Sequence, residues 1–119
     1  MDEVFQQFQT WFLSKKAKWD TLGIQVDKAG LSEFGHQYWI KMHSDQGLGN
    51  IVLYESNGYY WVDFEGGNYD YDVMFQRSGI TFQNIDELDC YEKILFSILH
   101  EQTFNNYKNE EKLYDRFIR

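Results

Sequence analysis

The stretch DFEGGNYDYD, residues 63–72, carries acidic side chains at a density that invites a chemical explanation. No lysine or arginine accompanies them, and three aromatic residues lie between them. Like charges this close repel one another, so an unpaired cluster costs free energy unless something uses it. A catalytic carboxylate pair, a divalent-cation site and a surface for a positively charged partner are the three candidate uses. The four acids are Asp63, Glu65, Asp70 and Asp72.

Catalytic and metal chemistry find little support in the residue pattern. Carboxylate oxygens suit Mg²⁺ or Ca²⁺, but the stretch lacks the ligand spacing of an EF-hand loop. His36, His43 and His100 show neither metal-ligand nor triad spacing, and Cys90 has no visible catalytic partner. The glycines of residues 47–50 indicate a turn rather than a phosphate loop. We therefore expect no enzyme, no metal and no cofactor, and we interpret these residues as structural.

The net charge of −8 is concentrated in the middle of the chain. Residues 45–92 hold ten acids against one base, Arg77, whereas the flanking segments are close to neutral. A surface of one sign speeds association with a basic partner by roughly 10–10³-fold. Direct nucleic-acid binding is disfavoured, because phosphates are held by Lys and Arg. The alternative is that the acids are a solvated face with no partner.

Length and composition predict one domain over residues 1–119 with a real core. The chain has a single cysteine, no basic-then-apolar segment at its start and no apolar run that could span a bilayer. These features predict a cytoplasmic protein without membrane contact.

Hydrophobic periodicity predicts helices at both ends and strands between them. The first helix buries Phe5, Phe8 and Phe12, and the second is capped by Asn84 with Glu87 three residues later. Helices are expected over 2–19, 84–102 and within 105–119. Strands are expected over 24–27, 37–43, within the hairpin 51–65, and over 69–75.

The strongest local signal is Asn57-Gly58, the preferred type I′ turn, between two strand-like runs. A two-residue loop places Ser56 opposite Tyr59 and fixes every later pair. The inward face should then carry Ile51, Leu53, Val62 and Phe64. The outward face should carry Tyr54, Tyr59, Trp61, Asp63 and Glu65, because unpaired carboxylates are costly to bury.

Alternation over 69–75 would place Tyr69, Tyr71, Val73 and Phe75 on one side, with Asp70, Asp72 and Met74 on the other. We expect an α+β domain with an antiparallel sheet of about four to five strands and helices packed on one face. The other face would stay open, unless a terminal helix covers Trp39, Tyr54 and Trp61. The residues predicted to contact a partner are Tyr54, Tyr59, Trp61, Asp63, Glu65, Asp70 and Asp72.

The segment GLGNIVLYESNGYYWVDFEGGNYD follows a helix containing FQTWF and precedes ITFQNIDELDCYEKILFSIL. Over roughly residues 8–99 this layout resembles small bacterial immunity proteins of contact-dependent growth inhibition and related polymorphic toxin systems. The resemblance implies a cytosolic protein that binds and neutralises the C-terminal domain of one cognate toxin. Some toxins countered by such proteins cut tRNA, and some work with elongation factor Tu, which would then be an indirect partner.

Three functions remain as hypotheses. The first is an immunity protein against a basic nuclease, such as a tRNA-cleaving ribonuclease, because an acidic aromatic face suits a basic active site. The second is an acidic interaction module, for example a DNA mimic. The third, which the pattern favours least, is a small hydrolase.

Overall fold

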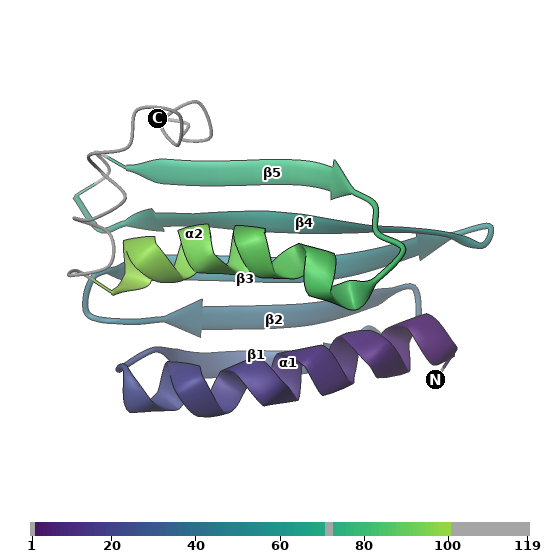
Figure 1. Ribbon diagram of the computed structural model, residues 1–119, viewed down its shortest axis with the longest axis horizontal. Coiled ribbons are helices and arrows are strands. Elements are labelled where there is room, and N and C mark those ends of the chain that lie inside the picture. The colour runs from purple at the N-terminus through teal and green to yellow at the C-terminus, as the bar shows by residue number, and fades with distance from the viewer. Residues whose placement is uncertain (1, 71–72, 101–119) are drawn as a thin grey trace.

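Two helices pack against a five-stranded antiparallel sheet in the computed structural model, which describes residues 2–70 and 73–100 (Figure 1). The helices are α1 (Glu3–Thr21) and α2 (Asp89–Leu99), and a 3₁₀ turn, η1 (Ile85–Leu88), leads into α2. The strands are β1 (Gln25–Leu31), β2 (Gln37–His43), β3 (Gly47–Ser56), β4 (Tyr59–Asn68) and β5 (Met74–Ile80).

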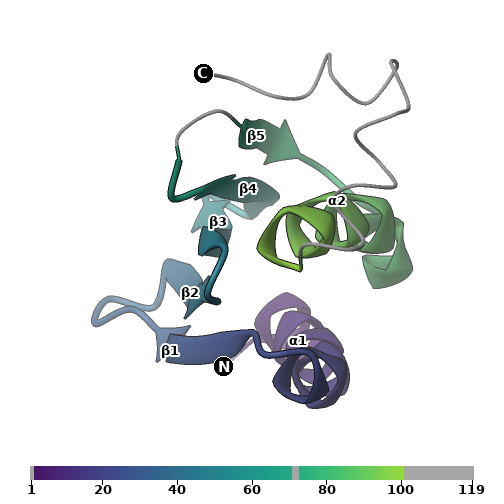
Figure 2. The same cartoon turned by 90° about the vertical axis from the view of Figure 1, so that its left-hand side faces the viewer.

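The strands follow one another in space as they do in sequence, in the order β1-β2-β3-β4-β5. Both helices lie on the same face of this sheet (Figure 2). No element among the described residues covers the other face, which we call the open face. The predicted α+β architecture is therefore confirmed, with an N-terminal helix, an antiparallel sheet and a C-terminal helix on one face.

Helix α1 forms where the aromatic periodicity predicts it. The Asp2 side chain caps it by accepting a 2.9 Å hydrogen bond from the backbone N–H of Phe5. The helix ends at Thr21 with Leu22 as its C-cap, and Gly23 with a φ of 81° turns the chain toward β1. Its buried residues face the sheet and α2. They are Phe5, Phe8, Trp11, Phe12 and Trp19.

The β3–β4 hairpin has the register that the turn predicts. Asn57 and Gly58 both have positive φ, 53° and 82°, as a type I′ turn requires. Ser56 pairs with Tyr59, and the register continues without interruption to Gly47 opposite Asn68. The four side chains predicted to point inward are fully buried at 0% exposure. They are Ile51, Leu53, Val62 and Phe64.

The predicted strand over 69–75 is wrong in its first half. Strand β4 runs on to Asn68, Tyr69 and Asp70 form a turn, and β5 begins only at Met74. The turn is held by Asn68, whose backbone N–H donates to the Val73 carbonyl and whose Oδ1 accepts from the Val73 N–H. These local hydrogen bonds outweigh the alternation of side chains, which is a weaker preference.

Other boundaries also differ from expectation. Strand β3 begins at Gly47, so the glycines of residues 47–50 lie in a strand and the predicted turn there is wrong. Strand β1 reaches Leu31 because a bulge between Val26 and Lys28 lets pairing with β2 continue. The capping box of Asn84 and Glu87 is present, but it opens a 3₁₀ turn before the α-helix. Residues 101–102 of the predicted second helix, and the predicted tail helix within 105–119, lie outside the described residues. No described helix is long and apolar enough to cross a membrane.

Candidate functional site

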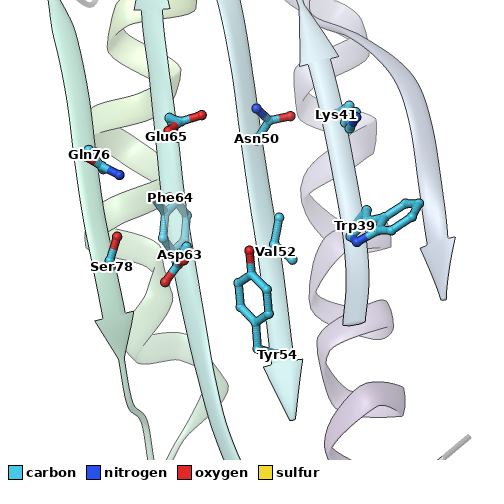
Figure 3. A pocket seen from close by; sticks show the side chains of 10 residues that line it. All are labelled: Trp39, Lys41, Asn50, Val52, Tyr54, Asp63, Phe64, Glu65, Gln76 and Ser78. Atoms are coloured by element: carbon cyan, nitrogen blue, oxygen red, sulfur yellow. The ribbon is translucent and has the colours of Figure 1, made fainter. Parts of the chain in front are cut away.

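A row of four polar side chains crosses the open face at right angles to the strands (Figure 3). Strand pairing aligns Lys41 of β2 with Asn50 of β3, Asn50 with Glu65 of β4, and Glu65 with Gln76 of β5. Within residues 2–70 and 73–100, none of these four side chains has a hydrogen bond or ion pair. Side chains in one such row lie about 5 Å apart, so one ligand group can reach several of them.

Beside this row the open face is hollowed, with a cavity volume of about 270 Å³. Val52 forms an apolar floor, Trp39 stands on the β2 side, and Asp63 and Ser78 stand on the opposite side (Figure 3). The Tyr54 ring closes one end with its hydroxyl directed toward the polar row. The hollow therefore combines aromatic and aliphatic surface with several hydrogen-bonding groups, as binding sites generally do.

The aromatic side chains of the open face are held in place by neighbours. Tyr54 stacks on Trp61 with ring centroids 5.4 Å apart and planes 12° from parallel. The Trp39 indole N–H donates a 2.6 Å hydrogen bond to Gln37, and the Lys28 ammonium lies 5.0 Å from the centre of the Trp39 ring. Rings fixed in this way lose little conformational entropy when a partner covers them.

The two carboxylates of the site have different surroundings. Asp63 Oδ1 accepts a 2.8 Å hydrogen bond from the Gly79 N–H, where pairing between β4 and β5 is irregular. Glu65 is exposed and has no partner among the described residues. Partial burial, and then the negative charges of Asp63 and Glu65, raise the pKa of the Tyr54 hydroxyl, so it remains a neutral donor at physiological pH.

A second hollow, of about 190 Å³, adjoins the first along the open face. Asn50 and Glu65 line both, so the polar row lies between them. The second hollow is more apolar, because Leu48, Met74 and the exposed Tyr69 contribute to its wall. The open face thus offers a two-part depression centred on Glu65.

The structure brings together four of the seven predicted contact residues. Tyr54, Trp61, Asp63 and Glu65 lie near one another on the open face, on β3 and β4. Tyr59, 76% exposed, lies beside the hairpin turn. Asp70 lies in the turn after β4 rather than in the predicted strand. Asp72 lies outside the described residues.

The acidic block of the sequence does not form one continuous surface. Its second half folds onto the helical side, where Asp89 accepts from the Trp11 indole and Glu92 from the Trp19 indole. On the open face, Lys28 of β1 and Lys41 of β2 lie on the half of the sheet away from Asp63 and Glu65 of β4. Sequence reasoning missed Lys41, Asn50, Gln76 and Ser78 as members of the site. Asn50 could have been placed opposite Glu65 by extending the hairpin register. Lys41, Gln76 and Ser78 depend on the registers of β2 and β5, which no local turn signal reveals.

Two histidine–carboxylate pairs were also not predicted from the sequence. His36 Nδ1 lies 2.8 Å from Glu55, and His43 Nδ1 lies 2.8 Å from Asp27. Within the described part of the chain no hydroxyl or thiol is hydrogen bonded to either imidazole. The exposed Cys90 thiol donates a hydrogen bond to the Glu87 carbonyl, and the described residues contain no group of three metal-ligating side chains.

Comparison with known proteins adds no further constraint. No protein-family model, curated protein or solved structure matches this chain.

Proposed function

We propose that this chain is an immunity protein that binds and neutralises a cognate toxin domain, a basic nuclease, through the open face. The proposal rests on one arrangement. The stacked Tyr54 and Trp61 rings share a sheet face that no described element covers with Glu65, a carboxylate without a partner in the described residues. Fixed aromatic rings anchor protein interfaces, and nearby charges select the partner.

The dimensions of the open face fit this use. Five strands span about 19 Å, and seven to ten residues per strand give about 23–33 Å along them. The flat area is then on the order of 500 Å², whereas a standard interface takes about 800 Å² from each partner. A partner would therefore need the whole open face together with a rim, such as the hairpin end that carries Tyr59.

A nuclease is the favoured class of toxin because its active site must be basic to hold phosphates. Close charge pairs at a nuclease–inhibitor interface couple by roughly 1.5–7 kcal/mol, so a few acids are enough to matter. A DNA mimic, the alternative, would need an unbroken array of carboxylates. Lys28 and Lys41 interrupt such an array on the open face, which favours a partner with mixed charge.

The test is co-expression of the tagged chain with the product of the gene directly upstream, where the proposed function predicts the cognate toxin to be encoded. We expect the two to co-purify and the chain to restore growth to cells that make the toxin. A Trp61→Ala variant should rescue growth less well, whereas Leu13→Ala, on the exposed side of α1, should rescue it fully. Absence of a complex and of rescue by the unmodified chain would refute the proposed function.

A further inference from the structure

We propose that the hollow on the open face receives an arginine side chain of the partner, with Glu65 as its principal carboxylate. This inference rests on the proposed function only in taking the occupant from a protein partner. The hollow itself is defined by the strands and its lining side chains, which are present without a partner.

The acceptor groups around Glu65 suit a donor with several N–H groups. Asn50 and Gln76 flank Glu65 in register on the two neighbouring strands, and each carries an amide oxygen. Asp63 lies two residues back on the same face of β4, with one oxygen already bound to Gly79. A guanidinium presents five N–H donors in a planar fork, so it can bind the carboxylate and a neighbouring amide together.

The rest of the hollow suits the body of an arginine side chain. Val52 offers an aliphatic floor on which the methylene stem can lie, as stems of long cationic residues commonly do. The Tyr54 ring, on the strand next to that of Glu65, offers a surface on which a guanidinium can stack, whereas Trp39 on β2 lines the far side of the hollow. A lysine ammonium is compact and strongly hydrated, so it would use neither the rings nor several acceptors at once.

The charges of the open face also set the direction of approach. Lys41 stands on β2, two strand spacings or about 10 Å from Glu65 on β4. It disfavours a cation over β2 and leaves the β4 side as the place for one. Lys41 should therefore weaken arginine binding, whereas Glu65 should strengthen it. Removing the two charges one at a time should change the affinity for arginine in opposite directions.

The experiment uses small probes, so it does not depend on identifying the partner. N-acetyl-arginine amide, its lysine counterpart and its neutral isostere N-acetyl-citrulline amide are titrated into the ¹⁵N-labelled full chain. The Trp39 indole N–H resonance reports on occupancy. The same titrations are made on Glu65→Gln, on Lys41→Gln and on Glu33→Gln, a control that removes an exposed acid from the β1–β2 loop.

We expect saturable shifts with the arginine probe and weaker binding of the lysine and citrulline probes. Glu65→Gln should weaken arginine binding about threefold, the scale of one exposed ion pair, and Lys41→Gln should strengthen it. Glu33→Gln should leave it unchanged. Equal binding of arginine and citrulline, no saturable shift, or an arginine affinity that Glu65→Gln leaves intact would overturn the inference.

These outcomes separate the inference from the proposed function. Selective binding of the arginine probe without a complex with the upstream gene product would support the arginine site and refute the proposed function. Neutralisation of the toxin without selective binding of the arginine probe would support the proposed function and refute the arginine site.

Discussion

The indole Nε1 of Trp19 donates a 2.7 Å hydrogen bond to Oε2 of Glu92, and the two residues are 73 positions apart. Both side chains are buried, Trp19 at 1% and Glu92 at 2% exposure. The contact joins α1 to α2 under the sheet, with the Lys18 ammonium 3.5 Å from the same carboxylate oxygen. Oε1 of Glu92 is buried without a hydrogen-bond partner among the described residues. The sequence predicts Glu92 to be a surface acid, but its carboxylate lies in the interior.

Replacing Glu92 should reveal how much this contact contributes to stability. Glu92→Leu leaves the Trp19 indole N–H buried without an acceptor, which should lower the free energy of unfolding by about 1–3 kcal/mol. Glu92→Gln retains an acceptor and should cost less. Urea unfolding of the three proteins measures the difference. A Glu92→Leu variant as stable as the wild type would show that the hydrogen bond contributes nothing net.

Asp89 makes the stability of the contact between α1 and α2 depend on pH. Burial alone would raise the pKa of Asp89, but the Trp11 indole and the Lys15 ammonium outweigh burial and hold that pKa below its ordinary value of 3.8. The stabilisation from Asp89 is therefore complete above pH 3.8 and is lost as pH falls through the lower, folded-state pKa.

The corresponding variant is Asp89→Asn, compared with Asp45→Asn in the exposed β2–β3 turn. Urea unfolding at a series of pH values should give wild type a larger free energy of unfolding than Asp89→Asn at neutral pH. The difference in free energy should shrink below pH 3.8. Asp45→Asn should show no such closing gap. A gap between wild type and Asp89→Asn that stays constant with pH would mean that the Asp89 charge is not what stabilises the contact.

The hairpin turn offers a test free of packing effects. Gly58 has a φ of 82°, and a Cβ built on it meets no atom within 4 Å. Gly58→Val should therefore cost about 1–2 kcal/mol through backbone strain alone. Asn57→Gly, at the other left-handed position, should be tolerated. Thermal unfolding measures both, and an unchanged melting temperature for Gly58→Val would contradict the type I′ assignment.

Trp61 should behave as an anchor of the partner interface. Removing its ring also uncovers Tyr54, which stacks on it, so Trp61→Ala should raise the dissociation rate of the toxin complex at a cost of about 2 kcal/mol or more. Tyr59→Ala, at the exposed hairpin end, should have a smaller effect. Dissociation rates from surface plasmon resonance compare the two, and equal rates for Trp61→Ala and wild type would place the anchor elsewhere.

The parts of the fold that local chemistry determines could be predicted from the sequence. Asn57-Gly58 permits one tight turn, and that turn fixes the whole β3–β4 register and the inward set led by Leu53 and Val62. Helix α1 and the capping box at Asn84 follow from short-range patterns in the same way.

The site depended on longer-range pairing, which the sequence did not reveal. Lys41 pairs with Asn50 in a register that depends on how the chain passes from β2 to β3. Gln76 pairs with Glu65 in a register that depends on the turn at 69–70, where alternation predicted a strand. The charge count placed Asp89 and Glu92 with the surface acids, because it took no account of the two tryptophans of α1 that bind them. Tertiary hydrogen bonds of this kind have no signature in spacing along the chain.

The most direct test of the open face as the binding surface is the association rate with the toxin domain at two salt concentrations. The double variant Asp63→Asn/Glu65→Gln keeps shape and removes two charges. The control Glu33→Gln/Asp45→Asn removes two exposed charges from the β1–β2 loop and the β2–β3 turn and gives the same net charge. Surface plasmon resonance measures the association rates of both variants and of the wild type.

If the open face guides the toxin, the double variant should associate more slowly than the control at low salt, and the difference should shrink as salt screens exposed charges beyond about 10 Å at 0.1 M. Equal association rates for the two variants at low salt would contradict binding through the open face. The interface would then have to lie on the helical side of the sheet or on another part of the chain.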